Sequence, residues 1–168
     1  MPNRFAGPCG RLSVVVLLGV VLDQATKWAA FKYLADPRYP GNFFELTSFL
    51  NLVLSYNEGG VFGVFKGGGI FFIALSVVAV FVILWMYVKS AGLDYVTTIA
   101  MGGILAGATG NLIDRMCYGY VRDFIDLHVG ARHWPTFNVA DVLICLGVAV
   151  MILNTLARGS QRPRKPLD

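Results

Sequence analysis

The sequence predicts an α-helical membrane protein with four transmembrane helices and a small β-sheet insert outside the membrane. Of its 168 residues, 56% are hydrophobic and only 14% are charged, whereas a soluble domain usually carries about 25% charged residues. One soluble core of this chain length cannot bury so much apolar surface. The net charge of +4 is scattered around apolar runs rather than gathered in a basic stripe, so we expect no nucleic-acid partner.

Four apolar stretches are long enough to cross a bilayer, which takes about 20 residues of helix. They lie at about 12–32, 69–88, 95–114 and 139–157. The first carries Asp23 and Lys27, whose spacing of four residues places them on one helix face, where they can pair. The second has no charged residue, and Trp85 and Tyr87 near its end suit a membrane interface.

The third stretch is rich in small residues at the spacing that lets a neighbouring helix approach closely. These are Gly102, Gly103, Ala106, Gly107 and Gly110. We therefore expect another helix to pack against this one at short distance.

Two polar intervals between the stretches are expected outside the membrane. The interval at about 41–66 is rich in aromatic and β-branched residues and contains several glycines, which predicts short strands and turns. Such a sheet cannot lie bare in hydrocarbon, so it should sit at the membrane interface or above it. The interval 115–138 joins the third and fourth stretches and carries both histidines of the chain.

The distribution of Lys and Arg predicts the orientation in the membrane. Four spans place both termini on one side, and that side holds seven basic residues against six on the other. The concentration of basic residues in the two short termini favours cytoplasmic termini. Both polar intervals then lie on the outer face.

This topology brings a set of polar residues to the outer end of the helices. The set comprises Asp23, Lys27, Asn57, Asn111, Asp114, Arg115, Asn138 and Asp141. Any one of them can be explained as an interfacial residue that holds helices together by hydrogen bonds. The whole set on one side favours a functional site, because ionisable groups at the rim of an apolar layer are costly.

Asp123 and Asp141 are the candidate catalytic pair. Two carboxylates close together do not both ionise easily, so one holds a proton while the other acts as a base. The base draws a proton from water, which attacks a peptide carbonyl, while the acid protonates the carbonyl oxygen. This chemistry needs neither a metal nor a cofactor.

Other polar residues in the outer loop have simpler explanations. Asp126 is an alternative partner in the pair, although its position favours a solvated loop carboxylate over this role. His128 and His133 have no third ligand placed with them, so we expect no metal site. Asp114 and Arg115 either form a local ion pair or support the site. The alternative function is a small proton-coupled transporter whose carboxylates relay protons. Such a relay should spread its carboxylates through the membrane depth, whereas the carboxylates of this chain gather at one end of the helices.

Five sequence blocks carry a family resemblance. They are DQATK at 23–27, NEGGVFG at 57–63, GATGNLIDR at 107–115, VRDFID at 121–126 and FNVAD at 137–141. In this order on four predicted spans, from residue 12 to about 156, the chain resembles the bacterial lipoprotein signal peptidases (signal peptidase II).

The resemblance implies one integral membrane domain, 1–168, with the activity of an aspartic endopeptidase in the bacterial inner membrane. The substrate is expected to be a prolipoprotein whose cysteine carries a diacylglyceryl group, and cleavage is expected just before that cysteine. The enzyme is expected to be a monomer that uses no cofactor and contacts membrane lipid. Asp123 and Asp141 match the family's catalytic aspartates. The residues expected to orient the pair, hold the scaffold or contact the substrate are Asp23, Lys27, Asn57, Asn111, Arg115 and Asn138.

The resemblance also implies an outer β-cradle at about 41–66 and a short helix in the outer loop 115–138, which can cover the site. The chain departs from the family pattern at Gly60 and Val61, where two alanines are expected. Glu58 and Arg122 place charges at positions where charged residues are uncommon in the family pattern. These departures bear on substrate preference and loop behaviour rather than on the reaction.

Overall fold

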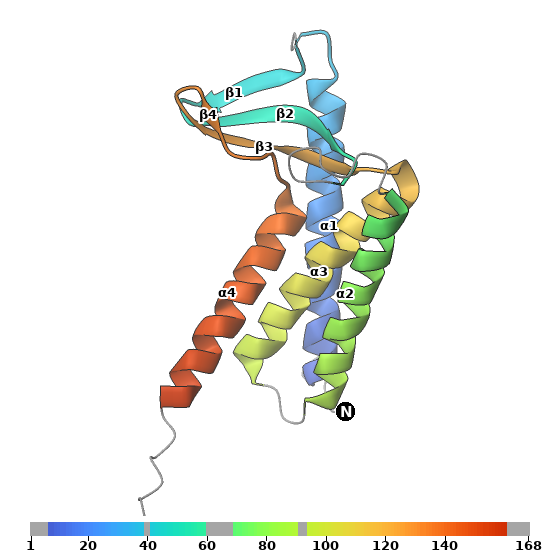
Figure 1. Ribbon diagram of the computed structural model, residues 1–168, viewed down its shortest axis with the longest axis vertical. Coiled ribbons are helices and arrows are strands. Elements are labelled where there is room, and N and C mark those ends of the chain that lie inside the picture. Colours follow the sequence, from blue (N-terminus) through green and yellow to red (C-terminus); the bar gives the residue numbers. More distant parts are fainter. Residues whose placement is uncertain (1–6, 39–40, 60–68, 91–93, 161–168) are drawn as a thin grey trace, which may run out of the picture.

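The computed structural model describes residues 7–38, 41–59, 69–90 and 94–160. In this part of the chain it contains a helical bundle with a β-sheet across one end (Figure 1). The helices are α1 (Pro8–Leu34), α2 (Gly69–Lys89), α3 (Tyr95–Tyr118) and α4 (Val139–Ser160). Each is long and apolar enough to cross a membrane, so the prediction of four spanning helices is confirmed.

Helix α3 is the centre of the bundle, and α1, α2 and α4 all pack against it. Of its most apolar stretch, 67% is buried inside the protein, against 6–17% for the other three helices. Met101 and Leu105 of α3 form a core with Leu12 of α1. Side chains such as Phe81 on α2 and Leu153 on α4 are exposed, which suits helix faces that contact lipid tails.

Small residues on α3 allow the close helix packing that the sequence predicts. A Cβ atom added to Gly107 would collide with the backbone oxygen of Ala140 in α4. A Cβ atom added to Gly110 would collide with the carboxylate of Asp23 in α1. The missing side chain at Gly110 therefore leaves room for a charged group of α1 against the backbone of α3.

The sheet has four strands in the order β1-β2-β3-β4, and each neighbouring pair is antiparallel. The strands are β1 (Phe43–Thr47), β2 (Leu50–Asn57), β3 (Val121–Val129) and β4 (Arg132–His133). Strands β1 and β2 come from the interval in which short strands are predicted. Residues 60–66 of that interval, including Gly60 and Val61, lie outside the described residues.

The connection between α3 and α4 corrects one expectation. The resemblance predicts a short helix within 115–138, but Val121–Val129 form strand β3, which pairs with β2. The sequence VRDFIDLHV is rich in residues that favour strands. A two-stranded hairpin of β1 and β2 alone would be marginally stable, and β3 and β4 complete a larger sheet.

Strand β3 begins directly beyond α3 because Gly119 ends that helix. Gly119 has φ +82°, and its backbone N–H donates to the oxygen of Arg115 at 3.1 Å. Glycine adopts this left-handed conformation without a steric penalty. Asp123 therefore follows four residues after the cap, on a strand that crosses the end of the bundle (Figure 1).

The packing of α3 against α4 predicts that alanine substitution destabilises the protein at one glycine of α3 and is tolerated at another. Gly107→Ala places a methyl group against the backbone of α4, which cannot yield easily, so we expect a loss of about 1–3 kcal/mol. Gly103→Ala is the matched control, since its nearest neighbour would be the oxygen of Leu143 at 3.5 Å, an ordinary contact. Thermal unfolding in detergent measures both, and equal unfolding temperatures would contradict the packing described here.

Candidate active site

The candidate pair is carried by two elements, with Asp123 on β3 and Asp141 in the first turn of α4. Asn138 joins them. Its side-chain amide donates to Asp123 Oδ1 at 2.6 Å, and its backbone N–H donates to Asp141 Oδ2 at 3.1 Å. The backbone N–H of Asp141 in turn donates to Asn138 Oδ1 at 3.2 Å. This reciprocal arrangement is a helix capping box, so the start of α4 itself sets the orientation of Asp141.

Two further asparagines complete the hydrogen bonds to the pair. Asn57, at the end of β2, donates to Asp123 Oδ2 at 2.9 Å. Asn111, on α3, donates to Asp141 Oδ1 at 2.8 Å. Every carboxylate oxygen of the pair thus accepts one hydrogen bond from an amide group. These neutral donors fix the orientation of both carboxylates without neutralising either.

Asp123 binds a proton more readily than an ordinary aspartate. Its side chain is buried, and this burial raises the pKa of Asp123 to about 6. Hydrogen bonds from Asn57 and Asn138 oppose the rise, and the negative charge of Asp141 adds to it. A carboxyl group that holds a proton near neutral pH is suited to act as a general acid.

Lys27 is a fully buried cation that reaches the pair through Asn111. Its Nζ donates to Asp23 Oδ2 and to Asn111 Oδ1, each at 2.9 Å, and lies 3.3 Å from Asp114 Oδ2. Asn111 links Lys27 to Asp141, because its side-chain amide donates a hydrogen bond to Asp141. The i,i+4 pair of Asp23 and Lys27 that the sequence predicts is therefore present, within a larger network.

Asp23 also fixes the start of α4. Its Oδ1 accepts a hydrogen bond at 2.9 Å from the backbone N–H of Ala140, the residue before Asp141. Gln24, the next residue on α1, donates to Asp114 at 3.0 Å and to the backbone oxygen of Gly110 at 3.1 Å. Helix α1 therefore holds both α3 and α4 at the depth of the pair.

Arg122 is a network member whose role the sequence analysis missed. Its guanidinium lies 2.7 Å from Asp114 and donates to Gln24 at 2.7 Å, and its backbone N–H donates to Asp114 at 2.9 Å. Side chains alternate along a strand, so Arg122 and its neighbour Asp123 point to opposite faces of β3. The same alternation would have been the signal for this role in the sequence, once 121–129 was recognised as a strand.

Asp114 and Arg115 do not form the local ion pair that was one of two expectations. Asp114 pairs with Lys27 and Arg122. Arg115 instead donates to the hydroxyl of Ser76 on α2 at 3.0 Å. It still interacts electrostatically with both Asp141 and Asp123. Arg115 therefore supplies positive charge on the α2 side of the pair.

Asp126 is neither a partner of Asp141 nor a solvated loop carboxylate. It is buried, accepts a hydrogen bond from Asn51 at 2.9 Å, and contacts His133 Nδ1 at 2.9 Å. Burial opposes ionisation, but these hydrogen bonds outweigh it and lower the pKa of Asp126. His128 and His133 stack with ring centroids 5.1 Å apart. The described residues contain no group of three or more His, Cys, Asp or Glu side chains suited to a metal ion.

The buried network predicts that loss of its central cation destabilises the fold. Lys27→Met keeps most of the side-chain volume but leaves Asp23 and Asp114 without this partner, which costs about 3–5 kcal/mol for a buried pair. Thermal unfolding in detergent measures the effect, with Lys89→Met at the exposed end of α2 as the control. An unfolding temperature equal to wild type would contradict a charged network.

Comparison with known proteins places these features in a family. A family model described as signal peptidase (SPase) II matches residues 15–157. A lipoprotein signal peptidase of Thermodesulfovibrio yellowstonii is 41% identical over 150 residues, which cover 88% of this chain and 96% of that protein. One of Ralstonia nicotianae is 41% identical over 156 residues, covering 90% and 86%.

Solved structures of bacterial membrane enzymes share the fold. One, described as determined by the in meso method at 2.3 Å resolution, has a TM-score of 0.78 and 29% identity, and the match covers 95% of both chains. Another, at 1.9 Å resolution, has a TM-score of 0.75 and 30% identity, covering 88% of this chain and 93% of that one.

These matches agree with the five sequence blocks and extend over nearly all of the spanning helices and the sheet. They give no support to the alternative of a proton-coupled transporter. By its family match and by its similarity to relatives over most of its length, the chain belongs to the signal peptidase II family of membrane proteases.

Proposed function

We propose that the protein is an aspartic endopeptidase that removes signal peptides from prolipoproteins, with Asp123 and Asp141 as its catalytic residues. The observation that carries this proposal is Asn138, which hydrogen-bonds to both carboxylates and so holds them as a pair. The raised pKa of Asp123, together with the negative charge of Asp141 beside it, supports a division into acid and base.

In the proposed reaction Asp141 is the base and Asp123 the acid. Asp141 takes a proton from water as the water oxygen bonds to the peptide carbonyl carbon, and Asp123 gives its proton to the carbonyl oxygen. Asp141 then returns its proton to the leaving nitrogen as the C–N bond breaks. Asp123 recovers a proton from the collapsing diol, so both residues regain their starting states.

The surrounding polar residues have positioning roles in this proposal. Asn57, Asn111 and Asn138 orient the carboxylates, and Lys27 holds Asn111 from behind. Arg115 contributes positive charge that offsets the negative charge of the pair as the diol forms. Asp23 acts on Asp141 indirectly, because it accepts a hydrogen bond from the backbone N–H of the preceding residue, Ala140.

The position of the pair, where the sheet crosses the helix ends, suits a substrate anchored in lipid (Figure 1). We propose that the substrate cysteine carries a diacylglyceryl group and that cleavage occurs just before it. Each buried CH₂ of such a group contributes about 0.8 kcal/mol, which holds the cysteine at a fixed depth near the carboxylates.

The proposed orientation has both termini in the cytoplasm and the pair near the outer face of the inner membrane. Basic Lys89 and Arg158 lie at the helix ends away from the sheet, as this orientation requires. The basic residues of 161–168 lie outside the described residues. We propose a monomer that needs no cofactor, since one chain supplies both carboxylates and all of their amide donors.

Cleavage of a diacylglyceryl-modified prolipoprotein by the purified protein in detergent tests the proposal. We expect Asp123→Asn and Asp141→Asn to lower kcat by about 10²–10⁴-fold, because each removes a proton-transfer group. Asp126→Asn is the matched control on the same strand, and it should keep most of the activity because Asp126 contacts Asn51 and His133. Activity should persist with a metal chelator.

Two results would contradict this assignment. Full activity in either Asp123→Asn or Asp141→Asn would remove that residue from the chemistry. Loss of activity in Asp126→Asn alone would move the site to the other face of β3.

A further inference from the structure

The far end of the sheet carries a group of side chains that the proposed chemistry does not use. Strands β3 and β4 form a hairpin in which His128 pairs with His133 and Val129 pairs with Arg132. Phe49, in the turn between β1 and β2, is joined to this hairpin by its backbone oxygen, which accepts from the N–H of His128 at 3.0 Å. A cavity of about 520 Å³ is lined by Phe49, Leu127, His128, Val129, Arg132, His133 and Trp134.

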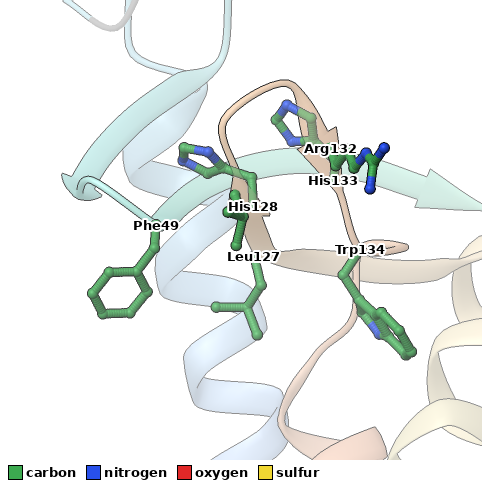
Figure 2. Close-up of a pocket in the computed structure, with 7 residues that line it drawn as sticks. Phe49, Leu127, His128, Arg132, His133 and Trp134 are labelled. Carbon is green, nitrogen blue, oxygen red and sulfur yellow. The ribbon is translucent and has the colours of Figure 1, made fainter.

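The two faces of the hairpin differ in chemistry because side chains alternate along each strand. One face carries Asp126, His128 and His133, which contact one another. The other face, together with Phe49, is called the hairpin face here, and its residues are Phe49, Leu127, Val129, Arg132 and Trp134. Figure 2 shows Leu127 and Trp134 pointing to the same side of the hairpin, with Phe49 next to Leu127.

The hairpin face is exposed although it is largely apolar. The exposed fraction is 83% for Val129, 68% for Trp134 and 56% for Phe49. Leaving so much clustered apolar surface in water is unfavourable. No carboxylate lies within ion-pair distance of Arg132 in the part of the chain that the structure describes. The face therefore offers apolar contact together with a cation that no described carboxylate neutralises.

The chain path keeps this face near the sheet-bearing end of α4, which is long and apolar enough to span a membrane. Trp134 precedes Val139, the first residue of α4, by five residues, which span at most about 18 Å when fully extended. The hairpin projects over the sheet-bearing end of α4 (Figure 1). Trp is enriched at membrane interfaces, and Arg forms bidentate hydrogen bonds with phosphate. An apolar patch next to the guanidinium of Arg132, which has no ion-pair partner among the described residues, matches a phospholipid with its acyl chains and its phosphate.

We propose that the hairpin face docks on the bilayer surface, with its apolar side chains among the upper acyl segments and Arg132 on the phosphate of an anionic phospholipid. The strand that carries Asp123 is then held at both ends. Arg122 ties one end to Asp114 and Gln24, and lipid holds the other. The proposal concerns membrane contact alone and stands whichever bond the carboxylate pair cleaves.

Fluorescence quenching of Trp134 tests the docking in the full-length protein. The chain has three tryptophans, and Trp28→Phe with Trp85→Phe leaves Trp134 as the only one. In phosphatidylcholine vesicles, we expect lipid brominated near the top of its acyl chains to quench Trp134 strongly, and aqueous acrylamide to quench it weakly. A variant that keeps only Trp85, exposed on spanning helix α2, is the reference for lipid contact.

Two outcomes of this experiment would overturn the proposal. Quenching by acrylamide without quenching by brominated lipid would place the hairpin face in water. Quenching by neither would mean that protein covers it.

The role of Arg132 is tested in the same vesicles by placing the bromine on a minor fraction of either phosphatidylglycerol or phosphatidylcholine. One basic residue near an anionic surface enriches anionic lipid about fivefold. We therefore expect brominated phosphatidylglycerol to quench Trp134 more strongly, with the difference lost in Arg132→Gln and kept in Arg132→Lys. Equal quenching by the two lipids in the protein with Arg132 would overturn the phosphate contact.

Discussion

A single buried cation, Lys27, links the elements on which the carboxylate pair depends. It contacts Asp23, Asn111 and Asp114 at 2.9–3.3 Å, and each of these holds a different part of the site. Asp23 binds the backbone at the start of α4, Asn111 binds Asp141, and Asp114 holds the beginning of β3 through Arg122. An unpaired charge at this depth costs several kcal/mol, so the network forms only when α1, α3, α4 and β3 are all in place.

Asp114 on α3 and Asp123 on β3 are both buried carboxylates, but their partners differ. This difference suits Asp114 to a structural role and Asp123 to its proposed chemical role. Asp114 is bound by the cations Lys27 and Arg122, which balance its charge. Asp123 accepts hydrogen bonds from the neutral amides of Asn57 and Asn138. Neutral donors orient a carboxyl group but leave its proton exchangeable, which acid–base chemistry requires. Buried cations would stabilise a permanently ionised form instead.

The sequence predicts the helices well because length and hydropathy along the chain are sufficient to recognise a membrane span. It also predicts Asp141 and its amide partners, which lie at the ends of those spans. It does not predict β3, because the partner strand β2 lies far away in sequence and the pairing register follows from tertiary contacts. For that reason Asp126 is misassigned as a loop carboxylate, and Arg122 is described as a departure from the family pattern instead of a member of the network.

Asp123 and Asp141 are proposed to form one electrostatically coupled pair, and titration of the Asp123 carboxyl group tests this coupling. Infrared difference spectra against pH would follow protonation of Asp123, with Asp123→Asn identifying its band. We expect protonation of Asp123 as the pH falls through about 6 in wild type. We expect a lower midpoint in Asp141→Asn, because burial still raises the pKa of Asp123 but the added effect of the Asp141 charge is gone. A wild-type midpoint near the ordinary value of about 3.9, unchanged in Asp141→Asn, would contradict the claim.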